Sequence, residues 1–279
     1  MKALSISCEF FPPRNEKGML TLNSVRQKLQ VLQPEYYSVT FGAGGSTQEK
    51  TFETVVQIQN ESKTDAAPHL SCIGSTHDNV LKLLEDYQKH GVRRIVALRG
   101  DQPSGWAGPI GEFSYANELV EFIRAKTGSH FHIEVAAYPE FHPESRNAKE
   151  DIKYFKQKVE AGANSAITQY FYNADAYFRL LDSCAAQGIE IPIIPGIMPI
   201  SNYEQLIRFS NTCGAEVPRW LQWRLRDFED DIDGLQAFGI DVMTDLCGRL
   251  LAGGAPGLHF YTLNQSKLTL TITKRLGLY

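Results

Sequence analysis

The sequence predicts an α/β fold of the (β/α)8 TIM-barrel class in a single domain. Three observations favour it. The chain has 279 residues, close to the roughly 250 residues of a typical barrel of this class. Short apolar runs alternate with segments of helical periodicity, as a parallel sheet wrapped by helices requires. Polar residues follow many of the apolar runs, where strands would end. We therefore expect one domain over residues 1–279; an open doubly wound sheet is the alternative.

The expected strands are the eight apolar runs, at about residues 4–11, 36–41, 68–73, 95–99, 131–138, 164–170, 191–196 and 257–263. Segments of helical spacing lie between them, at about 20–32, 48–61, 80–87, 118–126, 152–159, 177–187, much of 202–252, and 266–275. Pro192 and Pro195 argue against a regular central strand. We therefore expect the seventh strand to be irregular.

The composition excludes several classes of partner. The net charge is −4 and no long basic run occurs, so neither nucleic acid nor an anionic membrane is expected as a partner. The first residues lack the apolar core and cleavage site of a secretory signal, and no segment approaches the roughly 20 apolar residues of a membrane span. We expect a cytoplasmic protein. The five cysteines are widely spread, without a Cys-x-x-Cys pair, and are expected to be free thiols.

Polar residues at the strand ends form the candidate site. In a barrel, functional groups gather at the carboxyl ends of the strands. The residues at these ends are Glu9, Thr40, Arg99 with Asp101, Tyr138 and Gln169. Each one alone has a structural explanation, such as an ion pair for Glu9. Their convergence at one end of a barrel predicts a catalytic or binding site.

The two carboxylates have different surroundings. Glu9 lies between Cys8 and the pair Phe10 and Phe11, where burial is expected to raise its pKa and suit it to act as a general acid. Asp101 follows Arg99 and is expected to be ionised. The same pair would also suit a hydrolase that needs no cofactor, such as a glycosidase, if the separation of the carboxylates allowed it.

Two other patterns give weaker signals. The turn Gly42-Ala-Gly-Gly-Ser-Thr47 resembles a dinucleotide phosphate loop, but Thr47 replaces the third glycine. A turn that needs positive φ explains it equally well. His130 and His132 share one strand face, which is compatible with a metal, but no cysteine or acidic ligand set stands out nearby.

A set of motifs resembles a known family. They are Cys8-Glu-Phe-Phe-Pro-Pro-Arg14, Ser38-Val-Thr-Phe-Gly-Ala43, Ala67-Pro-His-Leu70, Leu98-Arg-Gly-Asp101, Tyr138-Pro-Glu-Phe-His-Pro-Glu144, Gly162-Ala-Asn-Ser-Ala-Ile-Thr-Gln169, Ile194-Pro-Gly-Ile-Met-Pro199 and His259-Phe-Tyr-Thr-Leu-Asn264. In this order, over nearly the whole chain, they are similar to the motifs of bacterial methylenetetrahydrofolate reductases.

The resemblance implies an activity and its cofactors. The family is a (β/α)8 barrel with non-covalent FAD. It reduces 5,10-methylenetetrahydrofolate to 5-methyltetrahydrofolate, which supplies the methyl group for methionine synthesis. Bacterial members generally take hydride from NADH and are homo-oligomers. For this chain we expect FAD as cofactor, a homo-oligomer, and NADH as hydride donor, with NADPH as the open alternative.

The resemblance also implies roles for individual residues. Glu9 would donate the proton that opens the methylene bridge, and Asp101 would face flavin and folate, favouring the cation formed there. The expected substrate contacts are Gln169, Gln205, Phe209 and Gln265. Thr40 and Tyr177 would face the nicotinamide nucleotide, and Gly100 would let the chain pass close to the flavin. The remaining FAD contacts would come from Phe41, Ala43, His69, Arg99, Gly100, Asp101, Tyr115, Ala116, Tyr138, His142, Ser145, Asp151 and Lys158.

The chain departs from the family pattern at four of these places. Phe41 stands where tyrosine is common, and Tyr154 and Gln157 stand where Asn and Arg are common. Gln265 stands where an arginine often serves the folate. Because Gln265 is uncharged, the acidic tail of the folate is expected to use another cation, such as Lys267.

Overall fold

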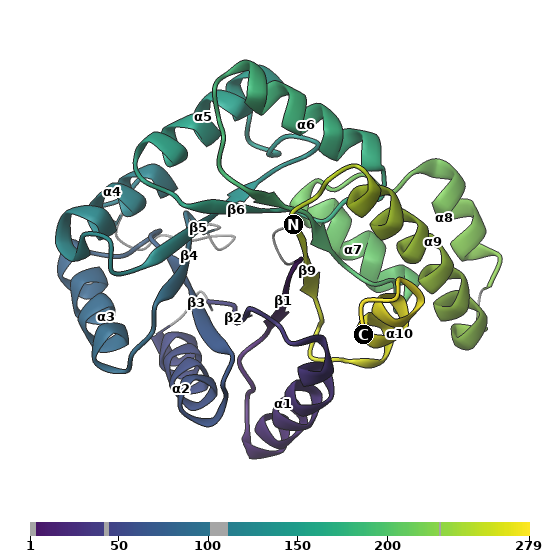
Figure 1. The fold of residues 1–279 in the computed structure, drawn as a ribbon, viewed down its shortest axis with the longest axis horizontal. Helices are drawn as coiled ribbons and strands as arrows, with labels where there is room; N and C mark the ends of the chain where they lie inside the picture. The colour runs from purple at the N-terminus through teal and green to yellow at the C-terminus, as the bar shows by residue number, and fades with distance from the viewer. Residues whose placement is uncertain (1–3, 42–44, 101–110, 229) are drawn as a thin grey trace.

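The computed structural model describes residues 4–41, 45–100, 111–228 and 230–279. Its strands are all parallel and lie in one sheet in the order β7-β6-β5-β4-β3-β2-β1-β9-β8. Helices surround this sheet, which curves into a nearly closed barrel (Figure 1). The predicted single-domain (β/α)8 barrel is confirmed. The strands are β1 (Ser5–Phe10), β2 (Tyr36–Val39), β3 (Asp65–Ser71), β4 (Arg94–Leu98), β5 (His132–Ala137), β6 (Ser165–Thr168), β7 (Ile193–Ile194), β8 (Gly196–Ile197) and β9 (Gly257–Tyr261).

The seventh barrel strand is broken at Pro195. Ile193 and Ile194 (β7) pair with β6, whereas Gly196 and Ile197 (β8) pair with β9. Proline has no N–H and cannot continue the ladder, but its carbonyl oxygen still accepts a hydrogen bond from the N–H of His259 at 3.0 Å. Two short strands thus take the place of one, which agrees with the irregularity expected from the prolines.

The helices begin where side chains can cap them. They are α1 (Glu16–Leu29), α2 (Gly45–Glu61), α3 (His77–Lys89), α4 (Ala116–Thr127), α5 (Ala148–Glu160), α6 (Ala174–Ala186), α7 (Tyr203–Cys213), α8 (Arg219–Arg226), α9 (Ile232–Ala252) and α10 (Lys267–Arg275). Asn15, Asn147, Asn173 and Asn202 each precede a helix and accept a hydrogen bond from a backbone N–H of its first turn, a favourable N-terminal cap.

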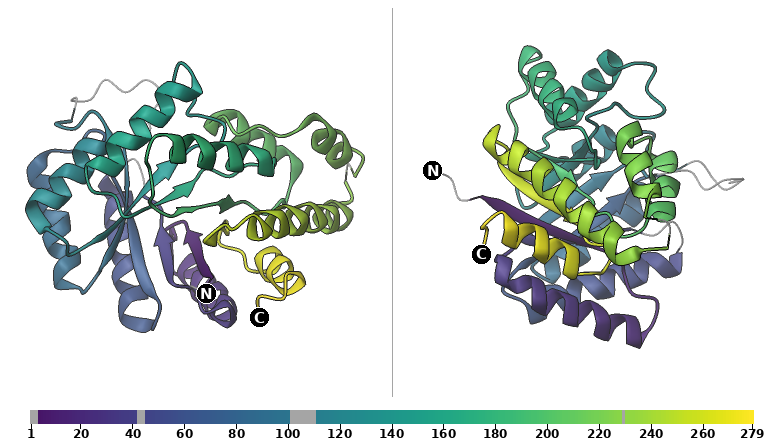
Figure 2. Two further views of the ribbon diagram at one scale, coloured as in Figure 1. Left: turned by 45° about the horizontal axis from the view of Figure 1, so that its top comes forward. Right: turned by 90° about the vertical axis from the view of Figure 1, so that its right-hand side faces the viewer.

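The region between β8 and β9 holds three helices rather than one. The helical pattern over 202–252 resolves into α7, α8 and α9, of which α9 packs beside α10 on the outside of the barrel (Figure 2). The main hydrophobic core lies between the strands and the surrounding helices. A second, small cluster consists of Tyr36, Ala67, Val96 and Ile167. Because neighbours such as Ile95 and Ala97 belong to the main core, alternation along the strands places this cluster inside the barrel.

Charged residues also lie inside the barrel. Glu134 of β5 is 1% exposed, and its Oε1 accepts a hydrogen bond from Nη1 of Arg94 at 2.5 Å. Arg94 also contacts Glu35 and lies over the ring of Tyr36. The pairing with Arg94 offsets the cost of burying the Glu134 carboxylate. Since Arg94 begins β4, this network belongs to the amino end of the barrel, where residues usually serve stability.

Candidate active site

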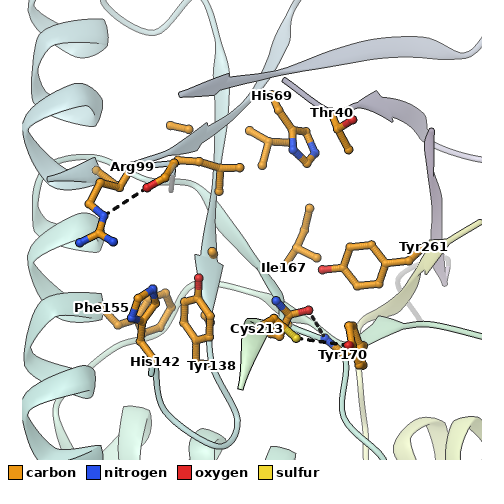
Figure 3. Close-up of a pocket in the computed structure, with 18 of the residues that line it drawn as sticks. Thr40, His69, Arg99, Tyr138, His142, Phe155, Ile167, Tyr170, Cys213 and Tyr261 are labelled. Carbon is orange, nitrogen blue, oxygen red and sulfur yellow. Dashed lines mark hydrogen bonds between the residues drawn. The ribbon is translucent and has the colours of Figure 1, made fainter. Parts of the chain in front are cut away.

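A cavity of about 830 Å³ lies at the carboxyl ends of the barrel strands. That volume is within the range of about 300–1,000 Å³ typical of small-molecule and cofactor sites. Its lining includes Glu9 of β1, His69 of β3 and Tyr261 of β9, together with residues of α4, α5 and α7. The site thus occupies the end of the barrel at which the sequence predicted it. Figure 3 shows part of the lining.

The structure brings most of the predicted site residues together. Those that line this cavity are Glu9, Thr40, His69, Arg99, Gly100, Tyr115, Ala116, Tyr138, His142, Ser145, Asp151, Lys158, Gln169 and Phe209. They come from six strands or strand ends, from the loop between β5 and α5, from the start of α4, from α5 and from α7. Asp101 and Ala43 lie outside the described residues.

Four other predicted residues do not line the cavity. Tyr177 is fully buried on α6, where its ring stacks on Phe171 and its hydroxyl donates to the carbonyl oxygen of Ile193 at 2.7 Å. This burial conflicts with the expected contact with a nicotinamide, so we do not retain that role. Phe41 packs against the main core. Gln205 lies in the first turn of α7, and Gln265 is exposed between β9 and α10.

Glu9 lies between two histidines that come from distant parts of the chain. Its Oε2 is 3.1 Å from Nε2 of His69 and 3.5 Å from Nε2 of His259. β9 pairs directly with β1 and places His259 beside Ser7, whose Oγ is 2.7 Å from Nδ1 of the ring. The ring of His259 also stacks on Tyr36. These contacts fix the ring of His259, a residue of the His259–Asn264 motif to which the sequence alone assigned no role.

The pKa of Glu9 is shifted downwards, whereas the sequence predicted an upward shift. Burial raises the pKa of this carboxyl, as expected from its apolar neighbours, but His69 and His259 together lower it by more, from 4.5 to about 2. The prediction was wrong because the two imidazoles are 60 or more positions away and do not appear in the local sequence. At neutral pH Glu9 is therefore ionised, beside two imidazoles that stabilise its negative charge.

The two imidazoles have unused hydrogen-bonding capacity. Within the described chain, Nε2 of His69 and Nε2 of His259 are buried and have no hydrogen bond of good geometry, although both lie near Glu9. Buried polar atoms without a partner are uncommon in folded proteins. Both atoms lie next to the cavity-lining carboxylate of Glu9, as expected where a ligand or water completes a site.

Arg99 occupies one side of the cavity and is paired with Glu144. Its Nη1 and Nη2 donate to the two carboxylate oxygens of Glu144 at 2.6 and 2.7 Å. The hydrogen bonds from Arg99 lower the pKa of the exposed Glu144 carboxyl. Sequence reasoning gave Glu144 no role. The sequence offered one sign of this pairing: Glu144 lies in the loop after β5, and β5 is the neighbour of β4, the strand that ends just before Arg99.

Helices α4 and α5 complete this side of the cavity. Tyr115, Ala116 and Asn117, at the start of α4, line it, and the first N–H groups of a helix have no partner within the helix. Nζ of Lys158 on α5 donates to the carbonyl oxygen of Ala136 at 2.5 Å. Burial lowers the pKa of Lys158 to about 8, although Asp151 opposes this shift.

A hydrogen-bonded cluster forms the other side of the cavity. The hydroxyl of Tyr170 is 3.2 Å from both Oγ of Ser210 and Sγ of Cys213. Nearby, the hydroxyl of Tyr261 donates to the carbonyl oxygen of Thr168 at 2.8 Å. Gly196 permits this packing, since a Cβ there would lie 2.1 Å from the same carbonyl oxygen. Sequence reasoning missed these aromatic residues because nothing local distinguishes them from core residues.

The described residues contain no cluster of three or more His, Cys, Asp or Glu side chains arranged to hold a metal ion. His130 and His132, considered above as ligands, instead contact Arg93 and Ser165 respectively. No described helix is both long enough and apolar enough to cross a membrane.

Comparison with known proteins identifies the family of this chain. A sequence model of the methylenetetrahydrofolate reductases matches residues 1–277. The chain belongs to the methylenetetrahydrofolate reductase family. It is 38% identical over 274 residues to the 5,10-methylenetetrahydrofolate reductase of Escherichia coli, covering 98% of this chain and 91% of that protein. The Buchnera aphidicola (Acyrthosiphon pisum) protein of that name is 40% identical over 275 residues, covering 99% of this chain and 92% of that protein.

More distant relatives agree in family or in fold. Methylenetetrahydrofolate reductase (NADH) 1 of Arabidopsis thaliana is 37% identical over 286 residues, which cover 98% of this chain and 48% of that protein. Among solved structures, an uncharacterised Clostridium thermocellum protein that binds two copies of 5-methyl-5,6,7,8-tetrahydrofolic acid aligns with a TM-score of 0.67 at 15% identity, covering 99% of this chain and 96% of that chain. A Xanthomonas albilineans dihydropteroate synthase aligns with a TM-score of 0.55 at 10% identity, covering 98% of this chain and 92% of that chain. At these identities the structures support the barrel fold alone.

Proposed function

We propose that this protein reduces 5,10-methylenetetrahydrofolate to 5-methyltetrahydrofolate, with FAD carrying hydride from NADH and with Glu9 delivering the proton. The observation that carries the proposal is the position of Glu9, between two imidazoles at the cavity of a methylenetetrahydrofolate reductase family barrel. The names of the bacterial relatives support the substrate, and the name of the Arabidopsis relative supports NADH rather than NADPH. The ligand named for the Clostridium protein is compatible with the same substrate class.

The residues present fit a flavin dinucleotide. The start of α4 offers backbone N–H groups, which bind phosphates well. Arg99 and Lys158 add positive charge on the same side of the cavity. Tyr115, Ala116, Tyr138, His142, Ser145 and Asp151 line that side and would hold the remainder of the cofactor. When bound, FAD supplies a carrier that accepts hydride from one substrate and gives it to the other.

Glu9 and the two imidazoles act as one proton-holding unit in this proposal. The low pKa of Glu9 means that its carboxylate is ionised at neutral pH, and Nε2 of His69 and Nε2 of His259 lie close enough to pass it a proton. The substrate displaces water and lowers the local dielectric, which favours transfer of that proton to Glu9 and on to the substrate nitrogen. Opening of the methylene bridge then leaves a cation on the substrate, and the carboxylate of Glu9 stabilises it.

The remaining residues hold the reactants. Gln169 can donate and accept hydrogen bonds at the end of β6, and Phe209 offers a ring against which a planar ligand can stack. Thr40 lines the cavity and is proposed to contact the nicotinamide. The proposals for Asp101 and Ala43 rest on the family resemblance alone, as do those for Phe41, Gln205 and Gln265. The cytoplasmic location and the homo-oligomer also remain predictions.

A flavin spectrum tests this proposal against the cofactor-free hydrolase. The purified protein should be yellow, or become yellow on adding FAD, and NADH should bleach its absorbance without oxygen. Methylenetetrahydrofolate should then restore the absorbance and yield one equivalent of 5-methyltetrahydrofolate. A protein that neither contains nor binds FAD, or whose reduced flavin ignores the folate, would overturn the proposal.

A further inference from the structure

Arg208 is a cation at the cavity to which no function has been assigned above. It lies on α7 and is exposed, and it lines the cavity together with Phe209, Thr212 and Cys213 of the same helix. We infer that Arg208 binds the carboxylates of the substrate's glutamate tail. This inference rests on the proposed function, because it assumes a folate in the cavity.

Arg208 is available for a ligand, whereas the other cavity cations are engaged. Arg99 is held by both carboxylate oxygens of Glu144. Lys158 is turned to the carbonyl oxygen of Ala136. Within the described residues Arg208 makes no salt bridge, and its guanidinium lies 5.6 Å from the centre of the Phe209 ring. An arginine in this state can bind a carboxylate without first losing another partner.

The reacting end and the acidic end of the substrate determine how the folate is oriented in the cavity. Its pterin nitrogens must reach Glu9, whose side chain is 12% exposed. Its carboxylates are costly to bury, so they must point towards the exposed rim. Arg208 offers positive charge at that rim, on the helix that also carries Phe209. A pterin near Glu9 with its aromatic ring against Phe209 would therefore bring the acidic tail towards Arg208.

Two other candidates for the tail are less well placed. The sequence had suggested Lys267 as a substitute for the uncharged Gln265. Lys267 is the first residue of α10 and does not line the cavity. Gln265 borders a separate hollow of about 10 Å³, too small for a ligand. Arg208 is thus the described cation that combines cavity lining, exposure and freedom from an ion pair.

Binding of 5-methyltetrahydrofolate with one or with three glutamates tests this inference. Both ligands would be titrated into the FAD-loaded protein at low and at physiological salt, in the wild type and in Arg208→Gln, Arg208→Lys and Arg224→Gln. Arg224 is a matched control, since it is also exposed and near an aromatic ring, Phe238, but lies on α8 outside the cavity. The rate at which NADH bleaches the flavin would be measured in each protein.

The inference predicts a selective loss of tail recognition. Arg208→Gln should weaken binding of the triglutamate about fivefold at low salt, and less at physiological salt because exposed charges are screened. The preference for three glutamates over one should fall with it. The turnover number at saturating folate and the bleaching by NADH should not change. Arg208→Lys should keep most of the affinity, and Arg224→Gln should match the wild type.

The possible failures are distinguishable. If Arg208→Gln binds the triglutamate as the wild type does, or if it weakens only NADH, the role of Arg208 is refuted while the proposed function stands. If the wild-type holoenzyme binds neither folate, both the proposed function and the inference are refuted. Equal weakening in Arg208→Gln and Arg224→Gln would show a general charge effect and would also refute the inference.

Discussion

Nε2 of His69 lies 3.1 Å from Oε2 of Glu9, although the two residues are on β3 and β1 and are separated by the whole of β2 in the sheet. His259 approaches the same oxygen from β9. The barrel thus surrounds its candidate acid with imidazoles from both directions. The pKa of Glu9 therefore depends on both histidines, which lower it together.

The first prediction concerns the titration of Glu9. Its pKa falls from 4.5 to about 2 on folding, so its ionised form stabilises the folded protein above about pH 4.5, and this stability is lost as the pH falls towards 2. The difference in unfolding free energy between wild type and Glu9→Gln should therefore shrink over that window. Carboxyl NMR on the protein with labelled glutamate, with Glu9→Gln to assign the signal, gives the pKa directly. In His69→Gln the Glu9 signal should titrate at higher pH, and a wild-type pKa above 4.5 would contradict the structure.

The second prediction concerns Lys158 and cofactor affinity. Its pKa of about 8 means that it is charged below pH 8 and loses its charge above it. Because a diphosphate favours the ammonium form, FAD affinity should fall above pH 8, by up to about tenfold per pH unit. Lys158→Arg keeps its charge throughout and should remove this dependence. Fluorescence titration of FAD from pH 6.5 to 9.5 measures it, and the same slope in both proteins would exclude Lys158 from phosphate binding.

The third prediction concerns Gly100, where the backbone conformation and the close packing of Ser71 require a glycine whether or not a ligand is bound. Its φ is +85°, and a Cβ there would lie 1.9 Å from Oγ of Ser71. Gly100→Ala should cost more than the roughly 1–2 kcal/mol expected from a left-handed alanine alone. Gly91→Ala is a matched control, since Gly91 has φ of +75° and nothing within 4 Å of the new Cβ. Urea unfolding of both variants, and of Gly100→Ala with Ser71→Gly, would measure the steric part. An equal loss of unfolding free energy in Gly91→Ala and Gly100→Ala would argue against a steric clash between Ser71 and a side chain at position 100.

The fourth prediction separates a buried tyrosine from the active site. Tyr177→Phe removes the hydrogen bond to Ile193 and should cost about 1–2 kcal/mol of unfolding free energy. It should leave the KM for NADH unchanged, because Tyr177 does not reach the cavity. A severalfold rise in that KM, with normal stability, would restore the contact with nicotinamide that the family resemblance implied.

The sequence predicted the barrel well because strand and helix periodicity are local properties. It also predicted an irregular seventh strand, since a proline removes the ladder hydrogen bond at its own position. The helix starts were less accurate: α1 and α6 begin at Glu16 and Ala174, a few residues before the expected ones, because the caps Asn15 and Asn173 were overlooked.

The site was predicted in position but not in its electrostatics. The polar strand ends converge as expected, because parallel strands of a barrel end at one edge. The direction of the Glu9 pKa shift was wrong because it depends on His69 and His259, which approach only in the folded barrel. The pairing of Arg99 with Glu144 also depends on the path of a loop. Contacts between distant segments were thus the information that local sequence lacked.

The central claim is that Glu9 delivers the proton needed by the folate. Single-turnover kinetics without oxygen, on FAD-loaded wild type and Glu9→Gln, test it most directly. Bleaching of the flavin by NADH needs no such proton and should stay within about twofold, whereas reoxidation by methylenetetrahydrofolate should slow by at least about 100-fold. Equal slowing of both steps, or reoxidation at the wild-type rate, would contradict the claim.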